Sequence, residues 1–502
     1  MDLLCHFWLK IGDHVPAIPD AAEQLFGGTG SNQAITIGGV DRNCTDAVND
    51  LTYIMLRATE LMKLRDPNLN ARYYRGINSE DYLKKLCEAN IVTGATPALH
   101  NDKAVIKALE AKDETPKQAR DYGIIGCVEP GSNGRFYGHS AAILLNLTSA
   151  LELSMFNGTH RHTGERQIGP ETGDPSTFNT FGEFWNAFET QTRWLIEQST
   201  ALNNLFGKTH QCFYPTPILS AFFEGPMQNG KDLIEGGAAI NASGATIIGL
   251  ADVADSLSAI QRVVFREGAD PREKRVTFAD LIGALERNFE GDTNDKALRL
   301  RLSKSEKTPK YGNEDPMANQ NVCRIVELLD EAFDMINNYR GGKYRVGYWT
   351  MTSHAGFGRL MGALPNGRKA SENFSSGITP VSGVTPDLVK TLGSVAFLPP
   401  ECFSNGVALN LKFNPIDGDD QKMLDNLVAY VESYFGDGGM EIQFNVISHD
   451  KFIEAVNNPE DYPDLLVRVS GYTAYFKDLT REMQKEIIDR TEYRLSTGRA
   501  SY

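Results

Sequence analysis

The sequence has no long apolar run and no clustered cysteines. No stretch approaches the roughly 18 consecutive apolar residues of a membrane-spanning helix, and residues 1–6 do not begin an export signal. The seven cysteines are spread along the whole chain, which offers neither a disulfide framework nor a CxxC pair for zinc or an iron–sulfur cluster. We therefore expect a cytoplasmic protein with no membrane span.

Basic residues are also scarce. The 502 residues contain 50 Lys and Arg against 65 Asp and Glu, a formal net charge of −15, and no long basic stripe. This balance argues against a dedicated nucleic-acid-binding protein. The sequence also lacks a GxxxxGK[ST] phosphate loop, an HExxH zinc helix and a GxSxG elbow, so the common nucleotidase, zinc protease and hydrolase patterns do not apply.

Hydrophobic periodicity predicts an α/β fold. Alternating apolar residues predict strands at 406–413 and 440–447, with a helix at 421–435 between them. A strand–helix–strand unit of this kind implies parallel pairing through a right-handed crossover. Further helices are expected at 143–156 and 322–336, and the chain length favours a barrel over an open sheet.

Cys127 lies in a glycine-rich segment, residues 123–131, with Glu129 two positions later. An isolated cysteine is usually a small buried hydrophobic residue. A thiolate nucleophile needs a cationic neighbour to lower its pKa, whereas Glu129 disfavours the thiolate. The pair is better suited to a sulfur that reacts as a neutral thiol or as a thiyl radical.

The segment Arg468-Val469-Ser470-Gly471-Tyr472-Thr473-Ala474 near the C-terminus resembles the signature of glycyl radical enzymes, the pyruvate formate-lyase superfamily. Residues 126–130, around Cys127, are similar to the thiyl loop of that family. Glycine at 471 also has a physical reason, because a side chain would oppose the planarity that stabilises a radical on a backbone Cα atom. Two paired signatures in this order identify the chain as a member of the superfamily.

The resemblance implies a fold and a radical mechanism. The expected fold is part of the family's ten-stranded β/α barrel, with helices outside and the thiyl and glycyl radical loops meeting inside. Gly471 would store the radical and pass it to Cys127, which would take hydrogen from the substrate. No permanently bound cofactor is implied, because a separate S-adenosylmethionine-dependent iron–sulfur activating enzyme would install the radical. A homodimer and small accessory subunits are further expectations.

The choice of reaction within the superfamily stays open in part. Val128 follows Cys127 where pyruvate formate-lyases carry a second cysteine, which argues against their acyl transfer. Glu129 resembles the base of the eliminases, the dehydratases and C–N or C–S lyases that act on small polar alcohols. The sequence at 66–72 and 470–479 is most similar to the alkylsuccinate synthase type, which adds a hydrocarbon to fumarate. We therefore expect fumarate addition, with elimination as the alternative.

Substrate-binding residues are expected after the thiyl loop. Ser140 stands where dehydratases carry an aspartate, and Arg135 and His139 lie beside it. Arg135, Arg72 and Arg359 are the candidates for a carboxylate clamp.

Family members are longer than this chain, so we expect an N-terminally truncated barrel domain at 1–375 and a glycine radical domain at 376–502. Two other classes remain as alternatives. One is a polar enzyme with Cys127 as nucleophile and His139 as base, and the other is an inactive scaffold.

Overall fold

The computed structural model describes residues 1–14, 30–161, 166–385, 387–415 and 420–494. The chain divides into two compact units. The first contains Met1–Phe136, Gly347–Ser353 and Ser376–Tyr502, and the second contains Tyr137–Val346 and His354–Ser375.

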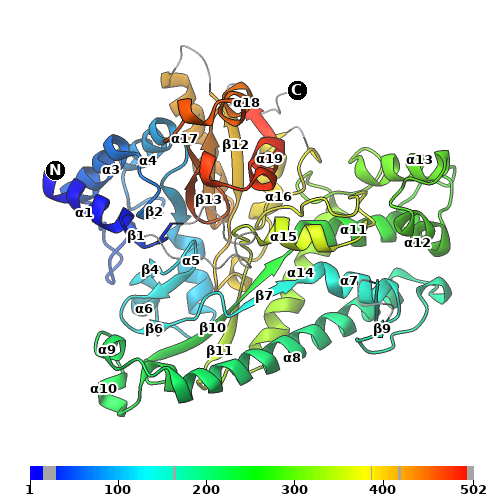
Figure 1. Ribbon diagram of the computed structural model, residues 1–502, viewed down its shortest axis with the longest axis horizontal. Helices are drawn as coiled ribbons and strands as arrows, with labels where there is room; N and C mark the ends of the chain where they lie inside the picture. Colours follow the sequence, from blue (N-terminus) through cyan, green and yellow to red (C-terminus); the bar gives the residue numbers. More distant parts are fainter. Residues whose placement is uncertain (15–29, 162–165, 386, 416–419, 495–502) are drawn as a thin grey trace. The chain divides into compact units, whose positions relative to one another are not determined.

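A six-stranded mixed sheet forms the centre of the first unit (Figure 1). Its first three strands pair in parallel, as do its last three, and β3 and β13 pair antiparallel where the two groups meet. In spatial order the strands are β1 (Ala34–Gly38), β2 (Asn68–Tyr73), β3 (Ala98–Asn101), β13 (Glu441–Val446), β12 (Asn410–Asn414) and β16 (Glu492–Arg494).

Three strands of this sheet, β2, β3 and β13, are buried along their whole length although they carry polar residues. β2 contains Asn68 and Asn70, and β13 contains Gln443 and Asn445. Polar side chains in such positions must find hydrogen-bond partners inside the protein, because burial without one is costly. This interior is therefore built for polar contacts rather than for apolar packing alone.

Helices and two short hairpins complete the first unit. The helices and 3-10 turns of the first unit are α1 (Asp2–Gly12), α3 (Asp50–Met62), α4 (Glu80–Thr93), α5 (Asp102–Glu110), α6 (Pro116–Arg120), α16 (Leu388–Ala396), η4 (Pro400–Cys402), α17 (Asp420–Gly436), α18 (His449–Asn457), η5 (Pro459–Asp461), η6 (Phe476–Asp478) and α19 (Arg481–Asp489). Among them, α4 packs against both α3 and α17.

The second unit contains a four-stranded sheet in which β10 pairs with three neighbours. The strands are β6 (Phe136–Tyr137), β7 (Ile143–Asn146), β10 (Ile240–Ile248) and β11 (Lys343–Gly347), with a separate pair β8 (Thr159–His160) and β9 (Arg166–Gln167). Its helices and turns are α7 (Leu147–Met155), η2 (Pro175–Thr177), α8 (Phe181–Phe213), α9 (Pro217–Ser220), α10 (Pro226–Asn229), η3 (Leu233–Glu235), α11 (Leu250–Val263), α12 (Phe278–Glu286), α13 (Thr293–Ser303), α14 (Pro316–Asp334) and α15 (Ser353–Leu360).

The strand–helix–strand prediction at 406–447 is confirmed, because β12 and β13 pair in parallel and α17 lies between them in the chain. β12 begins at Asn410, four residues later than the expected start of the first strand. The helix expected at 143–156 is only partly right. Residues 143–146 form β7, which pairs with β10, and the side chain of Asn146 then caps the N-terminus of α7. The continuous apolar run Ile143–Leu145 fits a helix and a strand equally well, and pairing with β10 makes it a strand. α14 ends at Asp334, two residues before the expected end.

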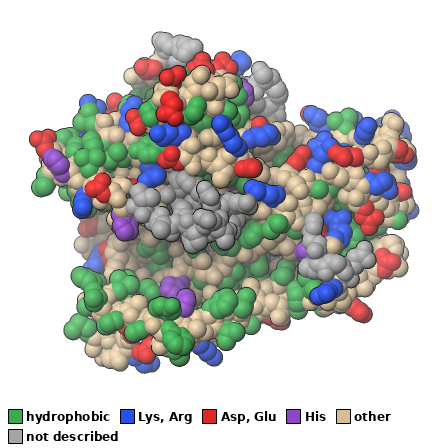
Figure 2. Space-filling view, viewed as in Figure 1, with side chains coloured by type: hydrophobic (Ala, Val, Ile, Leu, Met, Phe, Trp, Pro, Cys, Tyr) green, Lys and Arg blue, Asp and Glu red, His purple; other side chains and the backbone are tan. Residues whose placement is uncertain are grey.

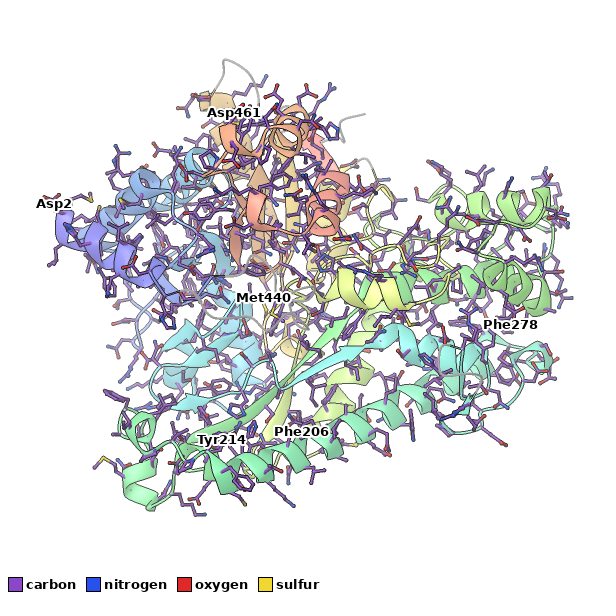
Figure 3. The ribbon with its side chains drawn as sticks, viewed as in Figure 1. Asp2, Phe206, Tyr214, Phe278, Met440 and Asp461 are labelled. Atoms are coloured by element: carbon purple, nitrogen blue, oxygen red, sulfur yellow. The ribbon has the colours of Figure 1, made fainter. Side chains whose placement is uncertain are left out.

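Large apolar side chains are exposed on the second unit, along the C-terminal half of α8 and over α9 and α10 (Figure 2). Phe206 and Tyr214 lie on this stretch (Figure 3), and Phe222 is 76% exposed. This face is therefore much more apolar than an ordinary solvent-exposed helix face.

The α/β fold class is confirmed. In the described residues the strands form several separate sheets, and their hydrogen-bond pairing does not close into one barrel. These sheets are compatible with the expected partial barrel. In the part of the chain that the structure describes, no helix is both long enough and apolar enough to cross a membrane.

Candidate active site

Cys127 lies at the tip of a short hairpin in the first unit. β4 (Tyr122–Ile124) and β5 (Pro130–Ser132) pair antiparallel, and the backbone N–H of Ile125 donates to the Glu129 carbonyl at 2.9 Å. This bond closes the loop and turns Cys127 into the interior, where it is 3% exposed. The glycine-rich sequence around Cys127 therefore encodes a tight loop that buries the sulfur.

Gly471 lies at the tip of a second hairpin. β14 (Leu466–Arg468) and β15 (Thr473–Tyr475) pair antiparallel, and the Val469 N–H donates to the Tyr472 carbonyl at 3.0 Å. Gly471 has φ +96°, a conformation that L side chains rarely adopt. The local backbone requires glycine here independently of any chemistry.

The tips of the two hairpins are in contact. A Cβ atom added to Gly471 would lie 2.4 Å from the Cβ of Cys127 and 3.3 Å from its Sγ. There is no room for a side chain, and a Cα hydrogen of Gly471 points at Cys127. Residues far apart in the sequence thus place a sulfur beside a backbone Cα–H bond.

Burial keeps the Cys127 thiol protonated. Desolvation raises the pKa of Cys127 far above its ordinary value, and the nearby charge of Glu129 raises it further, while Asn32 and Arg468 oppose the shift only in part. The Asn32 Nδ2 donates to Sγ at 3.2 Å. A neutral thiol is a hydrogen-atom donor and a poor nucleophile, which suits radical chemistry better than polar attack.

Glu129 folds back over the loop that carries Cys127. It is 2% exposed, and its Oε2 accepts a hydrogen bond from the backbone N–H of Val128 at 2.6 Å. Its Oε1 lies 2.5 Å from where a Cβ on Gly126 would be, so the glycine before the cysteine makes room for the carboxylate. The carboxylate and the sulfur therefore belong to one compact loop.

Arg468 is a fully buried cation that holds the glycine hairpin. Its guanidinium donates to the Gly471 carbonyl at 2.9 Å, to Asn68 Oδ1 at 2.7 Å and to Thr473 Oγ1 at 3.1 Å. Burial lowers the pKa of Arg468 to about 10 although Glu441 and Cys127 oppose this shift. The group remains charged at neutral pH and fixes the direction of the Gly471 carbonyl.

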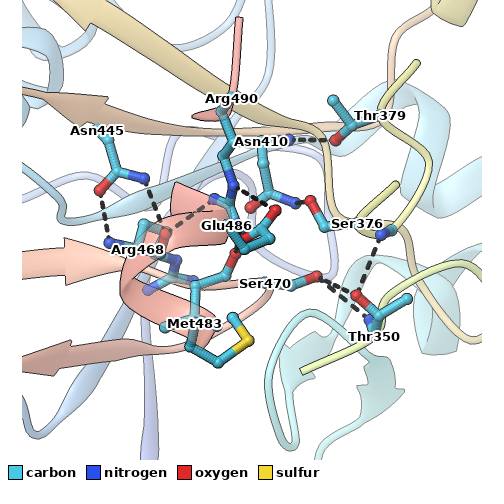
Figure 4. A network of polar contacts seen from close by, with 12 residues as sticks. Thr350, Ser376, Thr379, Asn410, Asn445, Arg468, Ser470, Met483, Glu486 and Arg490 are labelled. Atoms are coloured by element: carbon cyan, nitrogen blue, oxygen red, sulfur yellow. Dashed lines mark hydrogen bonds and ion pairs between the residues drawn. The ribbon is translucent and has the colours of Figure 1, made fainter. Parts of the chain in front are cut away.

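Other polar side chains hold the backbone of the same hairpin (Figure 4). Asn445 forms two hydrogen bonds with the backbone of Arg468, at 2.8 and 2.7 Å. Arg490, which directly follows α19, donates to the carbonyls of Arg468 and Val469 at 3.1 and 2.6 Å, and the N–H of Thr350 donates to Ser470 Oγ at 3.2 Å. The loop carrying Gly471 is thus held from several sides.

The expected substrate-binding residues belong to different units. Arg135 is half-buried in the first unit, in the turn that follows β5. His139 and Ser140 belong to the second unit, where the imidazole of His139 bonds to the hydroxyls of Tyr137 and Tyr339 at 2.9 and 3.3 Å. Burial lowers the pKa of His139 to about 4. The substrate-binding role of these three residues stays a prediction.

Arg72 is an unsuitable carboxylate clamp because Asp102 already occupies it. The Arg72 guanidinium donates to both Asp102 oxygens at 2.9 Å, and both side chains are buried. This pair is a structural contact between β2 and the start of α5.

Sequence reasoning assigned no role to Asn68, Asn445, Thr350 or Arg490. The one available signal was the asparagines of β2 and β13, Asn68 and Asn445, because polar residues in buried strands must be satisfied by partners far along the chain.

Comparison with known proteins agrees with this geometry. Residues 1–358 match the pyruvate formate lyase-like family, and residues 374–477 match the glycine radical family. The chain is 34% identical over 472 residues to trans-4-hydroxy-L-proline dehydratase of Clostridioides difficile, covering 91% of this chain and 56% of that protein. It is 33% identical over 472 residues to (2S)-3-sulfopropanediol dehydratase of Klebsiella oxytoca, covering 93% of this chain and 55% of that protein.

The fold is similar to that of the glycerol-bound B12-independent glycerol dehydratase from Clostridium butyricum. The TM-score is 0.90 and the sequence identity 31%, over 98% of this chain and 61% of that structure. This likeness confirms the glycyl radical enzyme type of the fold. The chain spans somewhat more than half the length of the relatives it matches.

The expectation of fumarate addition is wrong, because these relatives are dehydratases. The sequence that suggested an alkylsuccinate synthase, residues 66–72 and 470–479, contains Asn68 and Gly471, which hold or form the two hairpin tips, and Arg72, which pairs with Asp102. The resemblance in these two segments therefore reflects the structure around the radical site, which the superfamily shares, and not the identity of the substrate. On its sequence matches, its fold and its paired hairpins, the chain belongs to the pyruvate formate-lyase superfamily of glycyl radical enzymes.

Proposed function

We propose that this chain carries the radical centre of a glycyl radical eliminase that acts on a small polar alcohol. The observation that carries the proposal is the contact of the two hairpin tips, with Cys127 Sγ 3.3 Å from the Cβ position of Gly471. The buried neutral thiol and the adjacent Glu129 support it, as does the similarity to dehydratases.

The first steps are transfers of a hydrogen atom. Radical-bearing Gly471 takes hydrogen from the Cys127 thiol, so the S–H bond breaks, a Cα–H bond forms and the unpaired electron moves to sulfur. The thiyl radical then takes hydrogen from the substrate carbon that carries a hydroxyl group. Both transfers require reacting atoms in near contact, and a buried site excludes water and oxygen from them.

Glu129 acts next as a general base. Its carboxylate takes the proton of the substrate hydroxyl, a carbonyl forms on the radical carbon, and the neighbouring group leaves with its bonding electrons. Where that group is a hydroxyl, it takes up the proton that Glu129 received and departs as water. The product radical then takes the hydrogen back from Cys127. Loss of water, of an amine or of sulfite follows the same scheme, and Arg135, His139 and Ser140 are proposed to contact the substrate.

Gly471 is buried, and the proposed source of its radical is a separate S-adenosylmethionine-dependent iron–sulfur activating enzyme. The family match to the glycine radical segment supports this partner.

The test is anaerobic activation followed by electron paramagnetic resonance and product analysis. We expect a doublet signal and turnover of a diol, a hydroxylated amino acid or a hydroxysulfonate. Glu129→Gln, which keeps the size of the side chain but removes the base, should keep the doublet and lower kcat by about 10²-fold or more.

Turnover in air that is sensitive to thiol alkylation, without a radical signal, would instead indicate a polar cysteine enzyme. A doublet with full activity in Glu129→Gln would remove the base from the mechanism.

A further inference from the structure

Asn68 is a side chain that contacts both hairpin tips. It lies at the start of β2 and is 1% exposed. Its Nδ2 lies 3.1 Å from each of three carbonyl oxygens, those of Gly126, Cys127 and Gly471. One amide thus joins the loop of the sulfur to the loop of the radical glycine.

The other end of the Asn68 amide is also fixed. Its Oδ1 accepts a hydrogen bond from Arg468 Nη1 at 2.7 Å, and its backbone N–H donates to the Gln33 carbonyl at 2.9 Å. Since β2 is an inner strand of the sheet, Asn68 projects from a rigid element rather than from a loop. It therefore provides a fixed reference point for two loops.

Three carbonyl oxygens that converge on one point repel one another unless a donor lies between them. An amide NH2 group has two hydrogens, so here at least one is shared between acceptors. The carbonyl of Gly471 is part of the plane over which a Cα radical delocalises, and its direction sets where the Cα hydrogens point. Holding this carbonyl beside that of Cys127 therefore fixes the line between Cα and Sγ.

We propose that Asn68 is the positioning residue for hydrogen-atom transfer between Gly471 and Cys127, an inference that rests on the proposed function. Asn68 touches neither the sulfur nor the substrate in this role. It keeps the two tips at the separation and angle that transfer requires, for which small displacements cost large factors in rate.

The transfer step has its own spectroscopic readout. The one hydrogen that remains on Cα of the Gly471 radical splits its electron paramagnetic resonance signal into a doublet. Each passage of the radical to Cys127 and back lets Cα receive a hydrogen from the thiol, which exchanges with solvent. In D2O the doublet therefore collapses to a singlet, because deuterium couples more weakly than hydrogen. The collapse rate measures transfer without any need for substrate.

The experiment compares the activated whole protein with Asn68→Asp, which keeps the shape of the side chain but removes both donors. The matched control is Asn90→Asp. Asn90 is a fully buried asparagine of α4 whose Nδ2 also donates to two carbonyls, of Leu86 and Pro97. We expect collapse in D2O to slow by about tenfold or more in Asn68→Asp and to stay at the wild-type rate in Asn90→Asp.

Collapse of the Asn68→Asp doublet at the wild-type rate would overturn the inference. Equal slowing in Asn90→Asp would also overturn it, because any buried asparagine would then have the same effect. If Asn68→Asp does not fold, as judged by circular dichroism, the same comparison is made with Asn68→Ser. A wild-type protein with no doublet would instead refute the proposed function itself.

Discussion

At the scale of single residues, two atoms define the candidate site, the Cα of Gly471 and the Sγ of Cys127. Glycine at 471 is required twice. Its φ of +96° belongs to a region that glycine occupies easily, and the position of a Cβ atom is already filled by Cys127. The same packing that forbids a side chain brings sulfur close enough for hydrogen transfer. Structural and chemical requirements therefore coincide at this position.

Gly471→Ala should abolish the radical signal and also destabilise the protein. The matched control is Gly76→Ala, because Gly76 has φ +90° but nothing within 4 Å of its Cβ position. Both substitutions carry the backbone strain, whereas only Gly471→Ala forces a methyl group against Cys127. We expect the free energy of unfolding to fall by about 1–3 kcal/mol more in Gly471→Ala. Urea unfolding measures this difference, and equal losses in the two variants would mean that the tips are not packed as described.

At the scale of elements, the site consists of two hairpins held by neighbouring strands and one helix. Neither hairpin has more than three paired residues per strand, too few for independent stability. The backbone of the glycine hairpin is instead held by Asn445 from β13 and by Arg490 at the C-terminus of α19. α19 thus contributes to the site although it carries no reacting group.

Arg490→Ala tests this support. The substitution would remove the donor to the Val469 carbonyl, one of the two donors to the Arg468 carbonyl, and the buried cation that pairs with Glu486. Loss of one partner from such a buried pair should lower the free energy of unfolding by about 3–5 kcal/mol. Lys485→Ala, in α19, removes an exposed pair with Asp489 and should cost about 0.5 kcal/mol or less. Similar midpoints of urea unfolding for the two variants would contradict the assigned role of Arg490.

At the scale of the whole molecule, the site depends on chain segments that meet only after folding. The first unit is assembled from three separate stretches, and the residues around Gly471 come from all three. Such long-range assembly brings charged groups into the interior of the sheet. Glu441, on β13, is 1% exposed and accepts a hydrogen bond from the Leu409 N–H at 2.8 Å. Burial raises the pKa of Glu441 to about 8, although Leu409 and Arg468 lower it in part.

This shift predicts a pH dependence of stability. Between the ordinary carboxyl pKa of 4.5 and about 8, the folded chain holds a proton on Glu441 that the unfolded chain has released. The contribution of Glu441 is therefore complete below pH 4.5 and is lost as the pH rises to 8, by at most about 1.4 kcal/mol per unit.

Glu441→Gln lacks this dependence, so the free energy of unfolding of the wild type minus that of the variant should fall between pH 5.5 and 7.5. Urea unfolding at several pH values measures it, and a constant difference would show that Glu441 titrates normally.

The sequence by itself determined the local parts of this protein. Alternation at 406–413 and 440–447 gave parallel strands around a helix, and the glycine-rich segments around Cys127 and Gly471 gave two tight loops. These features depend on neighbouring residues, so their pattern is readable in one dimension. Membership in the superfamily also followed from them, because each signature is a short continuous stretch.

Only the tertiary structure decided what joins those parts. Residues 143–146 form a strand because β10 pairs with them. The segment 66–72, which resembles an alkylsuccinate synthase, contains Asn68 and Arg72, whose side chains bond to the Gly471 carbonyl and to Asp102. The resemblance at 66–72 led to a wrong expectation about the substrate, because the sequence did not show that Asn68 contacts Gly471 rather than the substrate. A contact between residues some 400 positions apart leaves no periodic pattern in the sequence. The meeting of Gly471 with Cys127, and the amide of Asn68 between them, arises only when distant strands pair and their side chains are buried together.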